Sequence, residues 1–118
     1  MSLTALTTAF EPGDIIWLPF PFVETLEVRS RPALVISAQP LGADLDLLWV
    51  LMITNASRPS WPGDVIIADH TAVGLPIPSK IRTEKISTVI SAGSEKMGKI
   101  GGTALSDVRS RVLGYLQK

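Results

Sequence analysis

The sequence predicts a mainly β domain, a small β-barrel or sandwich with one C-terminal α-helix. Three observations predict it: apolar runs of strand length, glycine and proline between them, and helical periodicity confined to the end of the chain. Short strands separated by turn residues are typical of small barrels and sandwiches. The length of 118 residues fits one domain. We expect this domain to span residues 13–118, after a flexible lead of residues 1–12.

The first predicted strand covers residues 14–20, where apolar side chains follow the turn residues Pro12 and Gly13. Pro19 and Pro21 cannot donate ladder hydrogen bonds. The strand therefore either ends there or lies at an edge of its sheet.

Four further segments complete the predicted sheet. Residues 32–37 are rich in branched side chains, and residues 47–54 are apolar almost throughout, which predicts burial on both faces. Residues 64–68 form a shorter run. Residues 81–86 alternate along the chain, and residues 88–90 continue after them.

The one helix is predicted at the C-terminus. Ser106 is a favourable N-cap, and Asp107 follows in the first turn, where the helix dipole favours a negative charge. Apolar residues then recur at helical spacing, and we expect this stripe to pack on the barrel. The stripe consists of Leu105, Val108, Val112 and Leu116.

Composition constrains the partners. Hydrophobic residues make up 46% of the chain, more than a small soluble domain needs, so we expect an oligomer. The net charge of zero provides no general attraction to nucleic acid. Residues 80–99 are locally basic, which indicates either a binding face or an ordinary solvated surface.

Membrane insertion and export are not predicted. No apolar run approaches the ~20 residues of a membrane span. Residues 1–9 carry no positive charge and no apolar core, so they do not form a secretory signal. We expect a cytoplasmic protein.

Most catalytic classes are excluded. Cysteine is absent and His70 is the single histidine, so thiol catalysis and histidine-based metal clusters cannot be built. No phosphate-loop, dinucleotide-binding or nucleophile-elbow motif occurs. Any catalysis must use Arg, Thr, Ser, Glu or His70, and we expect His70 to be an exposed loop residue.

These residue types suffice for cleavage of RNA. RNA carries its own nucleophile, the 2′-hydroxyl, beside the scissile phosphate. An enzyme need only position the backbone, neutralise charge on phosphorus and manage two protons. The planar guanidinium of arginine suits phosphate oxygens. Neither a metal nor another cofactor is required, and we expect none.

Five segments carry a family pattern through their order and spacing. They are Gly13-Asp14-Ile15-Ile16-Trp17, Arg31-Pro32-Ala33-Leu34-Val35-Ile36-Ser37, the strand end Ile53-Thr54, Gly74-Leu75-Pro76-Ile77-Pro78-Ser79 with Ile81-Arg82-Thr83, and Gly98-Lys99-Ile100-Gly101. Together with the terminal helix they resemble toxins of the PemK/MazF type, endoribonucleases of type II toxin–antitoxin systems.

The resemblance implies a homodimeric SH3-like barrel that cleaves single-stranded RNA at selected sequences. It also implies a partner antitoxin, itself DNA-binding, that blocks the site. Arg31 falls on the family's catalytic arginine and Thr54 on its catalytic threonine. An Arg-x-Asp pair of one family branch is absent here, because Ile77 and Ser79 stand at those positions.

Six residues are candidates for substrate binding: Glu27, Ser57, Trp61, Ser79, Lys80 and Arg82. Glu27 is the nearest acidic residue before Arg31, although one residue closer than in the family pattern. Lys80 and Arg82 either contact phosphate or face solvent on an alternating strand. A tryptophan ring can stack on an RNA base if it is exposed. We expect this of Trp61, which lies in a polar loop, whereas Trp17 and Trp49 are expected in the core.

Two other functions stay open. One is a non-enzymatic toxin on the same fold, like the gyrase-poisoning CcdB proteins; the other is an SH3-like nucleic-acid-binding module. CcdB proteins depend on a C-terminal end with a tryptophan, whereas this chain ends Tyr115-Leu116-Gln117-Lys118. Expression in bacteria separates the three functions: arrest with RNA breakdown, arrest with DNA damage, or no effect.

Overall fold

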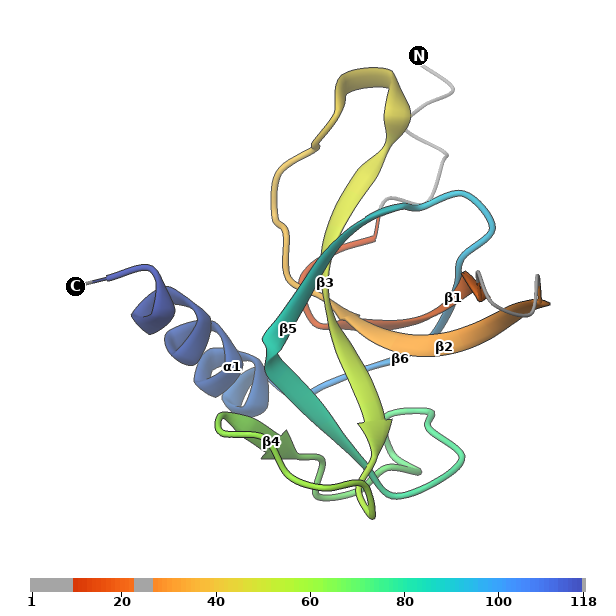
Figure 1. The fold of residues 1–118 in the computed structure, drawn as a ribbon. Helices are drawn as coiled ribbons and strands as arrows, with labels where there is room; N and C mark the ends of the chain where they lie inside the picture. Colours follow the sequence, from red (N-terminus) through yellow and green to blue (C-terminus); the bar gives the residue numbers. More distant parts are fainter. Residues whose placement is uncertain (1–9, 23–26, 118) are drawn as a thin grey trace.

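A computed structural model describes residues 10–22 and 27–117, which form one antiparallel sheet and a C-terminal helix (Figure 1). The sheet has the strand order β4-β5-β3-β2-β1-β6. The mainly β fold with a terminal helix is confirmed. The elements are β1 (Asp14–Phe22), β2 (Glu27–Val35), a 3₁₀ turn (Ala43–Leu45), β3 (Leu47–Asn55), β4 (Asp64–Ile66), β5 (Ser79–Ile90), β6 (Glu95–Lys99) and α1 (Gly102–Tyr115).

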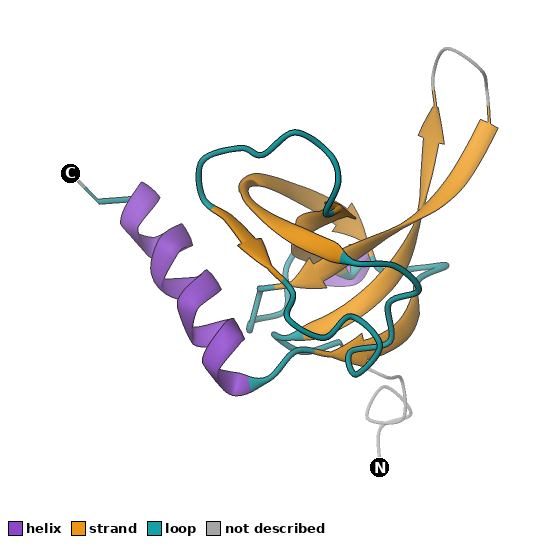
Figure 2. Cartoon of the chain, turned by 90° about the horizontal axis from the view of Figure 1, so that it is seen from below, coloured by secondary structure: helices purple, strands orange, loops and turns teal. Residues whose placement is uncertain are grey.

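The central strands bury side chains on both faces of the curved sheet. In β3, Leu51 and Ile53 belong to a cluster that includes Val108 of α1, whereas Val50 and Met52 belong to a second cluster. Alternation along a strand sends neighbouring side chains to opposite faces, which explains the two clusters. The expectation of burial on both faces is confirmed. In Figure 2, α1 lies on one side of the sheet and the β1–β2 hairpin extends on the other.

The prolines of β1 lie at an edge. β1 pairs with β2 through Pro19 and Pro21, whereas β6 pairs only with residues 14–17. Because the β1–β2 ladder continues past both prolines, their nitrogens face away from β2. Among the described residues, no strand pairs with that side. The edge alternative is confirmed.

β5 is one strand with a bulge. Leu51 of β3 lies opposite Ile86, but Ile53 lies opposite Ile81, so β5 contributes extra residues between these pairs. At the start of β5, residues 80–82 also pair with β4. Residues 79–83 are buried in consequence, whereas most of the rest of β5 is exposed.

Two glycines let the loop before β5 lie against β6. A Cβ atom on Gly74 would lie 2.3 Å from the carbonyl oxygen of Met97, and one on Gly98 would lie 2.1 Å from that of Val73. Gly74 also has a φ of 86°, which favours glycine. This approach holds the buried Leu75 in the first core cluster.

α1 begins earlier than the sequence predicts. Its N-cap is Gly101, in an extended conformation without a side-chain cap, and Ser106 lies inside the helix. The prediction of Ser106 as N-cap is wrong. Ala104 and Leu105 pack against the core, and this packing stabilises a first turn that capping preferences do not favour.

The apolar stripe of α1 packs only in part. Val108 is buried, and Leu105 and Val112 pack against the same cluster. Leu116 is 79% exposed, so its predicted packing is wrong. None of the helices in residues 10–22 and 27–117 has the length and apolar character of a membrane span.

The start of the described chain is tied to the sheet. Of the expected lead, residues 1–9 lie outside the described residues, and Phe10 packs against the second core cluster. Asp14, 2% exposed, accepts a hydrogen bond from the backbone N–H of Glu11 and pairs with Lys96. The acidic residue of the first motif therefore has a structural role.

Gly98→Ala should lower the free energy of unfolding by about 1–3 kcal/mol, because the added Cβ would overlap a backbone carbonyl of the packed loop. Gly114→Ala is the control. Nothing lies within 4 Å of a Cβ there, and alanine in a helix should add about 0.5–1 kcal/mol. Urea unfolding followed by tryptophan fluorescence measures both. A Gly98→Ala variant as stable as the parent contradicts the close approach.

Candidate active site

Strands β1, β2, β3 and β5 meet two loops around a pocket of about 360 Å³. The expected catalytic residues Arg31 and Thr54 both line it, together with Ser79. The described residues that line it are Trp17, Ser30, Arg31, Pro32, Ile53, Thr54, Asn55, Arg58, Leu75, Pro76, Ile77 and Ser79. Two of these residues are basic and none is acidic.

The pocket opens where β2 and β3 separate. Their paired register ends with Ala33 opposite Met52. Continued by two residues, the same register leads to Arg31 beside Thr54. Arg31 is exposed, and Thr54 is half-buried opposite Lys80 of β5. An arginine and a hydroxyl therefore face a common space from neighbouring strands.

Asn55 orders the loop that follows Thr54. Its Oδ1 accepts hydrogen bonds from the backbone N–H of Ser57 at 2.9 Å and from the Ser57 hydroxyl at 2.8 Å. Ser57 does not line the pocket; it holds Asn55, which does. Asn55 and Arg58 also line the pocket, although no sequence motif indicates them.

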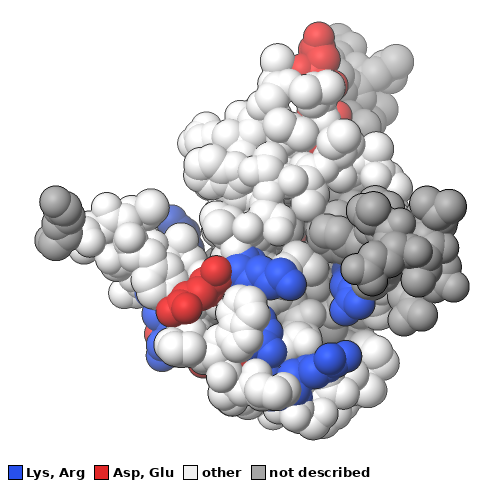
Figure 3. All heavy atoms as spheres, in the orientation of Figure 1, with Lys and Arg blue, Asp and Glu red and all other residues white. Residues whose placement is uncertain are grey.

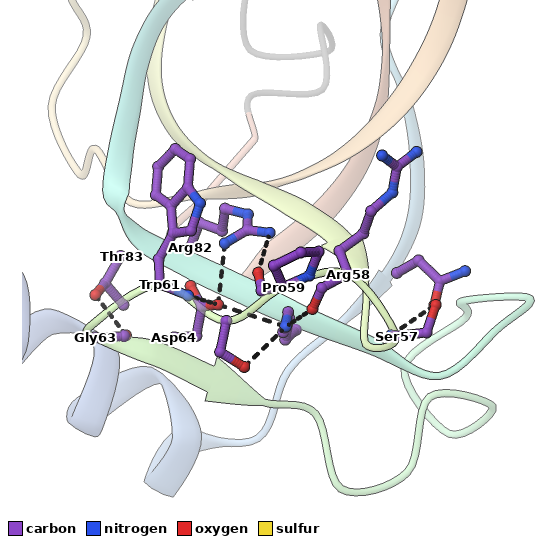
Figure 4. A network of polar contacts seen from close by, with 11 residues as sticks. Ser57, Arg58, Pro59, Trp61, Gly63, Asp64, Arg82 and Thr83 are labelled. Atoms are coloured by element: carbon purple, nitrogen blue, oxygen red, sulfur yellow. Dashed lines mark hydrogen bonds and ion pairs between the residues drawn. The ribbon is translucent and has the colours of Figure 1, made fainter.

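Lys80 and Arg82 are buried in a network under this loop (Figure 4). Nζ of Lys80 donates to the carbonyl oxygen of Arg58 at 2.5 Å and lies 3.7 Å from the Asp64 carboxylate. Arg82 pairs with the same carboxylate at 3.1 Å and donates to the carbonyl of Pro59 at 3.0 Å. Neither residue lines the pocket. Their burial argues against a direct phosphate contact, because β5 is covered there by its neighbours and the loop.

Trp61 extends this network to the surface. Its backbone N–H donates to Asp64, and the Arg82 guanidinium lies 4.4 Å from the centre of its ring. Trp61 is 42% exposed, as expected. Trp17 is half-buried and lines the pocket, but Trp49 is 46% exposed, so its expected place in the core is wrong.

The other expected residues divide as follows. The Ser79 hydroxyl donates to the carbonyl of Ile77 at 2.8 Å, and both residues line the pocket. The side chain of Glu27 lies outside the described part of the structure. His70 is half-buried and does not line the pocket. Within residues 10–22 and 27–117, no three His, Asp or Glu side chains gather as potential metal ligands.

Positive charge gathers near the pocket end of the sheet. Figure 3 shows Lys and Arg side chains in the lower half of the visible face, where β3 ends and β5 begins in Figure 1. A chain without net charge therefore carries a locally basic face.

The sequence matches the family described as PemK-like, MazF-like toxin of type II toxin–antitoxin systems over residues 11–116. The chain belongs to this family. A comparison with curated proteins finds no match.

Solved structures of MazF-type proteins share the fold. A chain of the MazE–MazF complex from Deinococcus radiodurans is 20% identical, with a TM-score of 0.70 over 92% of this chain and 96% of that one. A chain of a mycobacterial endoribonuclease bound to its cognate antitoxin is 13% identical, with a TM-score of 0.69 over 92% and 95%. The Mycobacterium tuberculosis toxin MazF-mt6 is 15% identical, with a TM-score of 0.62 over 85% and 94%. The toxin domain is thus an SH3-like barrel of the MazF type.

Asp64→Ala should destabilise the toxin domain by about 3–5 kcal/mol, because it leaves two buried cations without their shared carboxylate. Asp107→Ala is the control. It removes a carboxylate from an exposed pair with Arg111 on α1, which should cost about 0.5 kcal/mol. Thermal and urea unfolding measure both variants. Equal, small losses would show that the buried network contributes little.

Proposed function

We propose that this toxin is an endoribonuclease that cleaves single-stranded RNA at selected sequences. The observation that carries the proposal is the joint presence of Arg31 and Thr54 in one pocket whose described lining residues include no acidic side chain. Family membership and the basic face around the pocket support it.

The proposed reaction is attack by the RNA's own 2′-hydroxyl. The 2′-oxygen loses its proton and bonds to the adjacent phosphorus, while the bond to the 5′-oxygen breaks and that oxygen gains a proton. The products are a 2′,3′-cyclic phosphate and a 5′-hydroxyl. The Arg31 guanidinium stabilises charge on the phosphate oxygens, and the Thr54 hydroxyl donates a hydrogen bond to them. This chemistry requires no metal and no other cofactor.

The remaining expected residues act around this pair. Ser79 offers a hydroxyl in the pocket, and the half-exposed Trp61 offers a ring on which a base can stack. Ser57 acts through Asn55. Lys80 and Arg82 act through the loop they hold.

A second protein is proposed to control the site. Of the three solved structures named above, one is a complex with MazE and one is a complex with a cognate antitoxin. We propose a cognate antitoxin, itself DNA-binding, whose binding blocks the pocket.

The apolar surface supports a homodimer. A groove of about 620 Å³ lies between the end of α1 and the strands β3 and β5. Its lining includes four large apolar residues that are 46–79% exposed: Trp49, Ile86, Tyr115 and Leu116. Aromatic side chains carry on the order of 150–250 Å² each, so Trp49 and Tyr115 alone expose about 200 Å² together, and Ile86 and Leu116 add to this area. A standard interface buries about 800 Å² per partner, of which about 60% is non-polar. A second copy of this chain is the proposed occupant.

Purified protein should cleave a long single-stranded RNA in excess chelator, and Arg31→Ala should cleave it at least about 100-fold more slowly. Arg31→Lys should also be slow, because a point charge cannot replace the planar fork. Gel analysis and end-group chemistry measure rate and products. Activity that stops in chelator and returns with magnesium would sink the proposed mechanism.

Arg109→Ala is the control for this experiment, because it removes an exposed arginine on α1 that does not line the pocket. Its turnover should equal that of the parent. Expression of the parent in bacteria should arrest growth with RNA breakdown. Arrest with DNA damage, or no arrest, would indicate one of the two other functions.

Sedimentation should find a dimer at low micromolar concentration, and Ile86→Lys should convert it to a monomer, because it places a charge in the apolar groove. Leu113→Lys, at an exposed α1 position outside the groove lining, should remain a dimer. A parent protein that stays monomeric at high micromolar concentration rules out the dimer.

A further inference from the structure

Arg58 is a second arginine of the pocket, and the proposed chemistry does not use it. It lies in the loop between β3 and β4, close after Thr54, and its side chain is exposed. In Figure 4 its guanidinium points away from the buried polar network, and no marked contact reaches it. Among the described residues that line the pocket, Arg31 and Arg58 are the charged ones.

The backbone of Arg58, in contrast, is held from two sides. Its N–H donates to the carbonyl of Asn55 at 3.0 Å, and its own carbonyl accepts from Nζ of Lys80 at 2.5 Å. The next carbonyl, that of Pro59, accepts from Arg82. Lys80 and Arg82 lie two residues apart, on one face of β5. Two successive carbonyls of the loop are therefore held by two cations of one strand.

This use of Lys80 is costly. Its side chain is 1% exposed, and removal of an ammonium group from water costs several kcal/mol. Asp64, the Ser60 hydroxyl at 3.2 Å and the Arg58 carbonyl offset that cost. An apolar side chain would fill the same volume without a charge. The ammonium group differs in that it fixes the backbone from which Arg58 projects.

We propose that Arg58 binds a phosphate that flanks the scissile one, and that Lys80 is a positioning residue which holds Arg58 at the pocket. The proposal rests on the proposed function, because it takes single-stranded RNA as the ligand. Ile77 and Ser79 also line the pocket but are uncharged, so the second positive charge of the described lining comes from the loop after β3. Arg31 then stabilises charge on the reacting phosphate, whereas Arg58 contacts the flanking phosphate and strengthens RNA binding.

The test uses a single-stranded RNA oligonucleotide with every 2′-hydroxyl methylated, which binds but cannot react. Arg58→Ala should weaken its binding about 10- to 100-fold. It should also make the fall of log affinity with log salt concentration shallower, by about 0.7 in the slope. Arg58→Lys should keep the slope of the parent. Arg109→Ala should keep both affinity and slope. On cleavable RNA, Arg58→Ala should raise KM and leave kcat within about threefold, unlike Arg31→Ala.

Parent-like affinity and salt slope for Arg58→Ala overturn the proposal. A parent protein that does not bind the methylated oligonucleotide also overturns it. Binding that depends on Arg58 without any cleavage of unmodified RNA supports the phosphate contact and contradicts the ribonuclease function instead. The two failures are therefore distinguishable.

The role of Lys80 is tested by a double-mutant cycle. Lys80→Met should weaken binding in the parent but not in the Arg58→Ala background, because it acts through Arg58. Ser60→Ala, an exposed change that removes one Lys80 contact, should show the same pattern with about a twofold loss, and it does not endanger folding. Equal losses in both backgrounds would mean that Lys80 only stabilises the fold.

Discussion

Lys80 and Arg82 share one carboxylate, that of Asp64, and the wall of the pocket depends on this shared ion pairing. Two cations on one face of β5 can stay buried only if their remaining donors find acceptors. The carbonyls of Arg58 and Pro59 are those acceptors. The loop after β3 therefore cannot lift from β5 without leaving buried donors unpaired. The energy that stabilises this part of the fold also fixes the edge of the pocket.

Much of the fold could be predicted from the sequence, because burial leaves a pattern along the chain. The strands β1, β2 and β3 follow from apolar runs between turn residues. β6 was missed, since Glu95–Lys99 is mostly polar and contains a glycine whose role depends on the loop packed against it. The bulge of β5 was missed for a related reason: it arises from the register with β3 and from β4 on the other side. The start of α1 was misplaced because tertiary packing, rather than capping, decides it.

The residues of the candidate site that belong to a sequence motif could be predicted. Those whose exposure or contacts depend on neighbouring elements could not. The motif indicated Arg31 and Thr54, and both line the pocket. Alternation indicates that Lys80 and Arg82 share a face, but it does not say whether water or a loop covers that face. Trp49 reads as a core residue within an apolar strand, yet the residues that could cover it, at the end of α1, leave it half exposed. No sequence pattern indicates Arg58 as a pocket residue, because a single arginine in a loop is common. Its place at the pocket follows from the hydrogen bond between Lys80 and its carbonyl oxygen.

The prolines of β1 have a consequence for association between molecules. An edge strand with free N–H groups is a template on which another extended chain can add, the first step of many aggregates. Pro19 and Pro21 remove two such donors from the side of β1 that β6 leaves uncovered. A foreign strand would find carbonyls there without the matching donors. A small, unusually apolar protein is thereby protected from edge-to-edge growth at one margin of its sheet, whereas contact through side chains on the faces of the sheet stays available.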